Sequence, residues 1–247
     1  MNVLILGGNG YLGPYVVKAL AGEHSLRITD IKPSSSEIRQ EFQQHQFMDV
    51  DITSAPQVER AASGMDAIVN LSAVRNRLAF GVNLHGCYNM MQAAVTHGIQ
   101  RVINTGPHFT ITGPNYESFD YRINPDVPPH AGTSPYALSK SLGQEVCRAF
   151  SQNHNIYVQD YLFYNFRLPH QLKRGTGGVP FIVTPADAAE VFRLGLAIGL
   201  NRLPSRCETF FILGENPQGK FLNDKAKRIL GFAPRDDVTT VWRKTHR

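Results

Sequence analysis

Short apolar runs alternate along the chain with longer segments whose apolar residues recur at helical spacing. The runs cover residues 3–6, 26–30, 46–51, 65–73, 101–105, 161–165 and 208–213. The first of them, residues 3–6, is continuous, which is typical of a strand that is buried on both faces of a parallel sheet. Strands that alternate with helices predict an α/β fold built on a doubly wound parallel sheet with right-handed crossovers.

Glycines cluster directly after the first apolar run. Gly7, Gly10 and Gly13 follow residues 3–6, and residues 11–20 have the apolar spacing of a helix. Glycine lets the backbone approach a phosphate without a Cβ between them, and the N–H groups at a helix N-terminus attract an anion. The stretch therefore predicts a pyrophosphate cradle, and the alternative is a strand–helix turn that binds nothing.

Acidic residues end the second and third predicted strands. Asp30 follows Gly13 by 17 positions, where a carboxylate can accept both ribose hydroxyls of an adenosine and repels a 2′-phosphate. It predicts NAD as the cofactor, while Lys32 keeps NADP open as the second choice. Asp49 and Val50 lie where an open α/β sheet collects its ligand contacts, so we expect them beside the adenine.

A tyrosine and a lysine stand four positions apart at the start of a predicted helix, residues 134–154. Tyr136 and Lys140 therefore share one helix face, and Pro135 suits the first turn. A phenol with a pKa of ~10 is a poor base at neutral pH, but a nearby cation favours the phenolate. The pair is suited to proton transfer at a carbinol that gives up hydride to nicotinamide. A surface helix pair is the alternative.

Two further segments complete the predicted cofactor site. Small residues end the fourth strand, where a ribose can lie flat, and Asn83 in the next helix is either a satisfied core amide or a water-mediated anchor for Lys140. A proline- and glycine-rich loop, residues 106–134, predicts a wall of the active site. The predicted cofactor-binding residues are Gly7, Gly10, Tyr11, Leu12, Gly13, Asp30, Ile31, Asp49, Val50, Leu71, Ser72, Ala73, Asn83, Tyr136 and Lys140.

Composition excludes several classes of partner. The net charge is +5, but the positive residues are scattered apart from residues 220–228 and the tail, so we expect no nucleic-acid partner. No apolar stretch is long enough to cross a bilayer, and a core strand that begins at residue 2 argues against a signal peptide. The 3 cysteines lie far apart, so neither disulfides nor a metal site is expected. We expect a cytoplasmic location.

The order of these motifs resembles the extended short-chain dehydrogenase/reductase family, which includes NAD-dependent nucleotide-sugar epimerases and dehydratases. The resemblance covers almost the whole chain, and within that family the chain is most similar to uronate dehydrogenases. The stretches that carry the likeness are residues 86–89 with 93–94, the loop at His108, residues 134–140, and residues 230–237 with 241–243.

The resemblance implies NAD-dependent oxidation of a hexuronic acid at C1 to its aldarolactone. Tyr136 would be the acid/base and Lys140 would tune it. The family's catalytic serine sits just past the fifth strand, where this chain has Thr105. Thr105 is therefore the third predicted catalytic residue, with Thr110 and Thr112 as alternatives.

The expected partner is a small carbohydrate. An arginine follows the fourth strand in place of the usual small polar residue, and such a guanidinium can clamp a carboxylate or phosphate. The arginine usual after the sixth strand is missing, so the counter-charge falls to Arg174, Arg167 or Lys173. The predicted substrate-binding residues are Arg75, His108, Asn165 and Arg174.

We predict two parts: residues 1–165 as an NAD-binding Rossmann domain, and residues 166–247 as a small substrate lobe interleaved with the last strand and helices. The second hypothesis is a nucleotide-sugar epimerase or dehydratase with tightly bound NAD, although such enzymes carry a longer lobe. A cofactor-binding regulator without turnover is the third. Relatives often pair the helices at residues 80–97 and 134–154, so we expect a homodimer.

Overall fold

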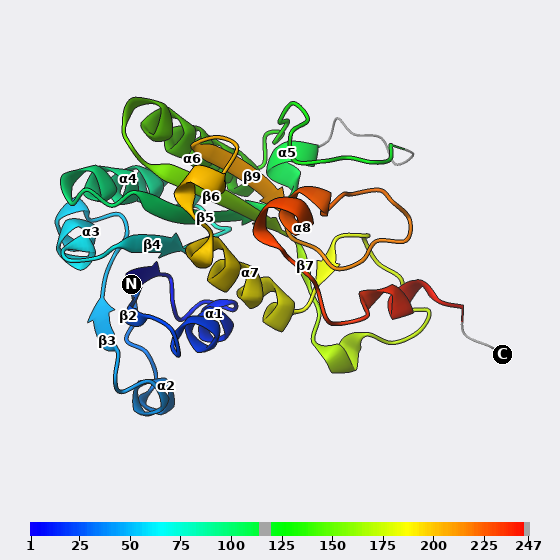
Figure 1. The fold of residues 1–247 in the computed structure, drawn as a ribbon, viewed down its shortest axis with the longest axis horizontal. Helices are drawn as coiled ribbons and strands as arrows, with labels where there is room; N and C mark the ends of the chain where they lie inside the picture. Colours follow the sequence, from blue (N-terminus) through cyan, green and yellow to red (C-terminus); the bar gives the residue numbers. More distant parts are fainter. Residues whose placement is uncertain (114–119, 245–247) are drawn as a thin grey trace.

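A seven-stranded parallel sheet forms the centre of the molecule (Figure 1). The structure is a computed structural model that describes residues 1–113 and 120–244. In sheet order the strands are β3 (Gln46–Asp49), β2 (Ser25–Asp30), β1 (Asn2–Leu6), β4 (Ala67–Asn70), β5 (Arg101–Pro107), β6 (Tyr157–Phe163) and β9 (Cys207–Phe211). The order reverses between β1 and β4, which is where a doubly wound sheet opens a crevice at its carboxyl edge. The predicted fold class is confirmed.

Helices cover both faces of this sheet (Figure 1). One face carries α3 (Ala55–Ala62), α4 (Gly86–Thr96) and α6 (Pro135–Asn153), and the other carries α1 (Gly13–Leu20) and α7 (Pro185–Ala197). Alternation along β1 shows why both faces are apolar. Val3 and Ile5 pack in the core cluster that contains α1 and α7, whereas Leu4 and Leu6 pack in the cluster that contains α3 and α4.

The predicted helix at residues 80–97 is made of two joined elements. A π-helix, η1 (Phe80–His85), leads directly into α4. At the junction a Cβ on Gly86 would approach the Ile52 side chain to 2.7 Å, so glycine allows the close packing of this helix on the preceding loop. A short polar helix, α2 (Ser36–Glu41), precedes β3.

The last third of the chain is interleaved with the central sheet. It supplies β9 and α7, and it also forms a separate two-stranded parallel sheet of β7 (Asn165–Phe166) and β8 (Ile182–Val183). The shorter elements are α5 (Phe109–Thr112), η2 (Pro169–Gln171), η3 (Leu200–Arg202), α8 (Asp224–Leu230) and η4 (Val238–Trp242). A division at residue 165 stays a prediction. Within the described ranges, no helix has both the length and the apolar character needed to span a bilayer.

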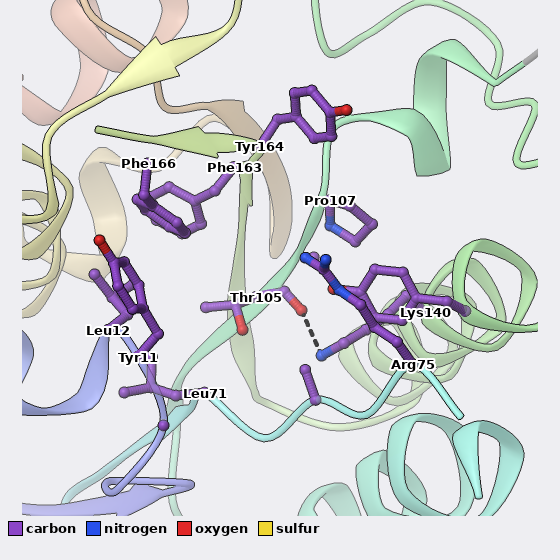
Figure 2. A pocket seen from close by; sticks show the side chains of 14 residues that line it. Tyr11, Leu12, Leu71, Arg75, Thr105, Pro107, Lys140, Phe163, Tyr164 and Phe166 are labelled. Atoms are coloured by element: carbon purple, nitrogen blue, oxygen red, sulfur yellow. Dashed lines mark hydrogen bonds between the residues drawn. The ribbon is translucent and has the colours of Figure 1, made fainter. Parts of the chain in front are cut away.

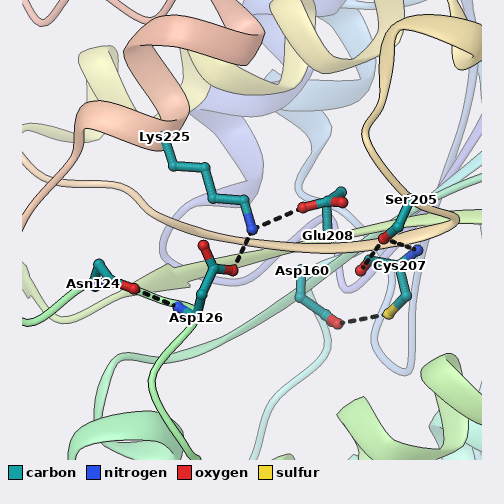
Figure 3. Close-up of polar contacts among 7 residues, drawn as sticks. All are labelled: Asn124, Asp126, Asp160, Ser205, Cys207, Glu208 and Lys225. Atoms are coloured by element: carbon teal, nitrogen blue, oxygen red, sulfur yellow. Dashed lines mark hydrogen bonds and ion pairs between the residues drawn. The ribbon is translucent and has the colours of Figure 1, made fainter.

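A half-buried lysine contacts the loop that precedes α6. Lys225 on α8 pairs with Asp126 of that loop and, at 2.7 Å, with Glu208 on β9 (Figure 3). The side chains of Lys225 and Glu208 are only 12% and 7% exposed, so the ion pair is largely shielded from water. The pairs tie the segment around Asp126 to α8 and β9. Residues 114–119 of the same predicted loop lie outside the described part of the chain.

Candidate active site

A cavity of about 250 Å³ opens at the carboxyl ends of the central strands (Figure 2). It is lined by Gly10, Tyr11, Leu12, Leu71, Ala73, Arg75, Thr105, Gly106, Pro107, Tyr136, Lys140, Phe163, Tyr164 and Phe166. The glycine turn, the end of β4, the end of β5 and the start of α6 thus meet around one space. The structure brings together the cofactor cradle and all three predicted catalytic residues.

The glycine turn has the shape of a phosphate cradle. Gly7 has a φ of +80°, and a Cβ there would lie 2.7 Å from the Ser72 nitrogen. A Cβ on Gly13 would lie 2.0 Å from the Gly8 oxygen. The N–H groups of Tyr11 and Leu12 have no hydrogen-bond acceptor among the residues that the structure describes. Free donors and a surface that excludes side chains fit a pyrophosphate at the start of α1.

The adenosine end of the cradle is organised around Asp30. Its two carboxylate oxygens accept the N–H groups of Asn9 at 3.0 Å and Ile31 at 2.8 Å, so the carboxylate is held against the glycine turn. Beside it Val50 is buried, and Asp49 is exposed with a 3.8 Å ion pair to Arg39. Carboxylate oxygens with one donor each can accept further hydrogen bonds, as ribose recognition requires.

Lys140 ties the ends of two strands together. Its ammonium donates to the Thr105 carbonyl at 2.9 Å (Figure 2). It also donates to the Ser72 carbonyl at 2.8 Å, and the residue is 3% exposed. Burial lowers the pKa of this amine to about 8, and the negative charge of Asp160 opposes that shift. The lysine therefore holds the cavity floor in place and keeps its charge near neutral pH.

Tyr136 lines the cavity beside Arg75. Burial raises the pKa of the phenol above its usual value, and the charge of Arg75 together with its hydrogen bond to the phenol opposes that rise. The Arg75 Cζ lies 5.1 Å from the centroid of the Tyr136 ring. The sequence assigned the cation near the phenol to Lys140; the structure adds Arg75 as a cation in direct contact with the ring.

Of the three candidate threonines, Thr105 is the one that lines the cavity. Its hydroxyl donates to the Asn70 carbonyl at 2.8 Å. Thr110 donates to the Pro107 carbonyl at 2.9 Å, and Thr112 donates weakly to the His108 carbonyl. Both are buried outside the cavity wall, so the geometry favours Thr105 for the role of the family's serine.

Asn83 has the contacts of a satisfied core amide. Its side chain accepts the Val74 N–H at 3.0 Å and donates to the Val74 carbonyl at 2.9 Å and to the Ser139 hydroxyl at 3.0 Å. These bonds join the loop after β4 to α6. Asn83 therefore supports the cavity from behind, and a direct role in cofactor binding stays a prediction.

The four predicted substrate-binding residues lie in different places. Arg75 lines the cavity. The His108 ring is 6% exposed and lies among the rings of Phe109, Tyr164, Phe181 and Phe221, and burial lowers its pKa to about 3, so the imidazole is neutral. Asn165 is half-buried in β7, and Arg174 is exposed; neither belongs to the cavity wall.

Sequence reasoning missed a chain of buried polar groups behind the cavity. Asn70 on β4 donates to Asn104 on β5 at 3.0 Å, and Asn104 donates to Asp160 on β6 at 2.7 Å. The Ser72 N–H donates to Asn70 at the cavity end, while the Cys207 thiol lies at 3.9 Å from Asp160 (Figure 3). Burial raises the pKa of Asp160 to about 6. The available signal was one amide inside each of two apolar runs, Asn70 and Asn104, and a carboxylate, Asp160, directly before a third.

Comparison with known proteins agrees with this geometry. The model of the NAD dependent epimerase/dehydratase family matches residues 3–178, which is most of the chain. The chain belongs to the NAD-dependent epimerase/dehydratase family. Membership confirms the predicted enzyme class, an NAD-dependent short-chain dehydrogenase/reductase acting as a sugar dehydrogenase or epimerase, and it confirms NAD as the cofactor.

Three relatives of this epimerase/dehydratase chain illustrate its range. It is 22% identical to an NAD-dependent glucose-6-phosphate dehydrogenase from Haloferax volcanii over 95% of this chain and 93% of that protein. It is 28% identical to a uronate dehydrogenase from Pseudomonas putida over 63% of this chain and 57% of that protein. A mutant uronate dehydrogenase from Agrobacterium tumefaciens, solved with NAD, superimposes with a TM-score of 0.77 at 21% identity, covering 96% and 86% of the two chains.

Proposed function

We propose that this protein oxidises a sugar acid at C1 with NAD, as a uronate-type dehydrogenase in which Tyr136 is the acid/base. The observation that carries the proposal is the position of Tyr136 and Lys140 in the wall of a single cavity that begins at the glycine turn. A phenol at that place is within reach of a substrate that lies between it and the nicotinamide end of a cofactor bound along the turn.

Each side chain has a separate task in this proposal. Tyr136 takes the proton of the C1 hydroxyl. Thr105 holds the same oxygen, and rotation about its C–O bond turns its hydrogen from the Asn70 carbonyl to the substrate. Lys140, which already bridges the Ser72 and Thr105 carbonyls, keeps the reacting groups at a fixed separation. Bound NAD supplies the hydride acceptor.

The cavity wall supports a small acidic substrate. Three aromatic side chains, Phe163, Tyr164 and Phe166, close the side opposite Lys140, so the space suits a single sugar ring. Arg75 supplies a positive charge in the same wall. The Pseudomonas putida relative is named a uronate dehydrogenase, and a uronate is a sugar acid. The proposal keeps His108, Asn165 and Arg174 as predicted substrate-binding residues, although they do not line the cavity.

A nucleotide-sugar epimerase or dehydratase is the second candidate, because the family that matches the chain includes both activities. The same tyrosine and lysine serve that chemistry, but NAD stays bound and is regenerated in each cycle. Net formation of reduced cofactor separates the two. A homodimer formed through the exposed Tyr88 on α4 and Leu142 on α6, and a cytoplasmic location, complete the proposal.

The test is the formation of reduced cofactor by purified protein with galacturonate, glucuronate, glucose 6-phosphate or arabinose, each with NAD and with NADP. We expect turnover with a uronate and NAD. Tyr136→Phe should lower kcat at least ~100-fold while binding of NAD, followed by fluorescence, stays unchanged. Turnover by Tyr136→Phe at the wild-type rate would exclude Tyr136 as the acid/base; turnover with glucose 6-phosphate alone would move the substrate class from uronates to sugar phosphates.

A further inference from the structure

The backbone next to Arg75, a residue of the cavity wall, is held by hydrogen bonds. Both backbone polar groups of Val74 are bonded to the buried side chain of Asn83, which in turn bonds the Ser139 hydroxyl on α6. The loop after β4 is thereby attached to the helix that carries Tyr136. These bonds fix the backbone next to Arg75 relative to the helix that carries Tyr136.

The guanidinium has a ring as its neighbour instead of a carboxylate. Its Cζ lies 5.1 Å from the centroid of the Tyr136 ring. Within the described ranges, no Asp or Glu side chain lies within ion-pair distance of Arg75. A cation over an aromatic face is attracted by the ring, and the attraction grows when the ring carries the negative charge of a phenolate.

Lys140 directs its ammonium elsewhere in this structure. Two of its three N–H donors bond the carbonyls of Ser72 and Thr105. The titratable side chains that share the cavity with the phenol are Tyr11, Arg75, Lys140 and Tyr164, and the Phe109 ring of α5 packs edge-on against Tyr136. Among them, Arg75 is the cation in contact with the ring.

We propose that Arg75 stabilises the ionised form of Tyr136, as a positioning residue that acts beside Lys140. The proposal rests on the proposed function, in which Tyr136 is the acid/base. From the sequence, Arg75 was predicted only to bind the charged group of the substrate. The proposal gives it a second task, in proton transfer. The effect of Arg75 on the pKa of Tyr136, which is opposite to that of burial, points the same way.

The direct test is spectrophotometric titration of Tyr136, taken as the difference between each protein and the same protein carrying Tyr136→Phe. Arg75→Gln should raise the pH at which Tyr136 ionises by about one unit, and Arg75→Lys should restore part of the shift. Arg77→Gln is the matched control, because Arg77 is an exposed arginine of the same loop outside the cavity wall. It should leave the titration unchanged. This readout needs no turnover, so it stands even if no uronate is oxidised.

The kinetic arm separates tuning from substrate binding. If Arg75 stabilises the phenolate, Arg75→Gln moves the acidic limb of the kcat profile to higher pH by the same amount, with uronates and with any neutral sugar that is turned over. High salt should reduce the difference, because Arg75 is exposed. Equal Tyr136 titrations in Arg75→Gln and Arg77→Gln, with a loss confined to KM for acidic substrates, would overturn the proposal and leave Arg75 as a substrate ligand only.

Discussion

Thr105 stands where the family's serine is expected, and its hydroxyl and its backbone carbonyl have separate partners. The residue is 8% exposed, and its hydroxyl bonds the Asn70 carbonyl while its own carbonyl receives Lys140. The backbone of this position thus supports the lysine whatever the side chain is. The hydroxyl, by contrast, is available for the substrate oxygen after rotation.

Removing that hydroxyl should affect catalysis more than folding. Thr105→Val keeps the shape but loses the donor, so we expect kcat to fall at least ~10-fold and the free energy of unfolding to fall by about 1 kcal/mol. Thr105→Ser should keep most of the activity. Steady-state kinetics and urea unfolding measure the two effects.

Thr110→Val is the control for this change. Thr110 is also buried and bonds a backbone carbonyl, but it does not line the cavity, so its loss should lower stability without lowering kcat. A Thr105→Val enzyme with the wild-type kcat would exclude Thr105 from the reaction.

At the scale of elements, the turn between β1 and α1 depends on local geometry. Gly13 is the first residue of α1, and the space where its Cβ would stand is filled by the Gly8 carbonyl. The Gly7 and Gly8 N–H groups both bond the Thr29 carbonyl at 2.9 and 2.8 Å, which fixes the turn against β2. The turn therefore cannot move aside to admit a side chain.

Gly13→Ala should accordingly lower the free energy of unfolding by about 3 kcal/mol and abolish binding of NAD. Gly22→Ala offers a control, because no atom lies within 4 Å of the Cβ it would add. It should change stability by less than about 0.5 kcal/mol. Denaturant unfolding and fluorescence titration with NAD distinguish the two variants. Undiminished NAD binding by Gly13→Ala would contradict the assignment of the cradle.

Local pattern explains why some elements could be predicted and others not. A short stretch of sequence determines β1, another the glycine turn, and a third the Tyr136–Lys140 pair. The sequence could therefore predict each of them and the site that they share. The Arg75–Tyr136 contact depends on how two distant segments pack, which no local pattern records. His108 was proposed from resemblance, and the fold surrounds its ring with aromatic side chains contributed by several elements.

At the scale of the whole molecule, a series of hydrogen-bonded polar side chains crosses the apolar interior of the sheet, from Asn70 through Asn104 to Asp160. Asp160 is 1% exposed, and its carboxylate accepts a hydrogen bond from the Asn104 amide. Burial raises its pKa to about 6 from an ordinary 3.8, while the charge of Lys140 and the bond from Asn104 oppose the rise. The ionised carboxylate therefore lowers the stability of the fold, and the charge of Lys140 offsets part of that loss.

The raised pKa of Asp160 predicts how the free energy of unfolding depends on pH. The folded protein binds the Asp160 proton more tightly than the unfolded chain, so this residue lowers stability as pH rises from about 4 to about 6, and the loss persists above that range. Asp160→Asn should remove the dependence and leave the variant more stable at neutral pH, by up to about 3 kcal/mol.

Urea unfolding at a series of pH values measures this effect. Glu41→Gln, which removes one exposed negative charge on α2, is the control for net charge. An Asp160→Asn curve parallel to the wild-type curve across the whole range would show that Asp160 does not titrate as a buried acid in the folded protein.

The most direct measurement of the central claim uses a uronate that carries deuterium at C1. With the protein and NAD, we predict accumulation of reduced cofactor that contains the deuterium, one equivalent for each lactone formed, and a slower rate than with the unlabelled sugar. The result that would contradict the account is NAD that binds and remains oxidised at every time point, with the C1 deuterium retained in the sugar.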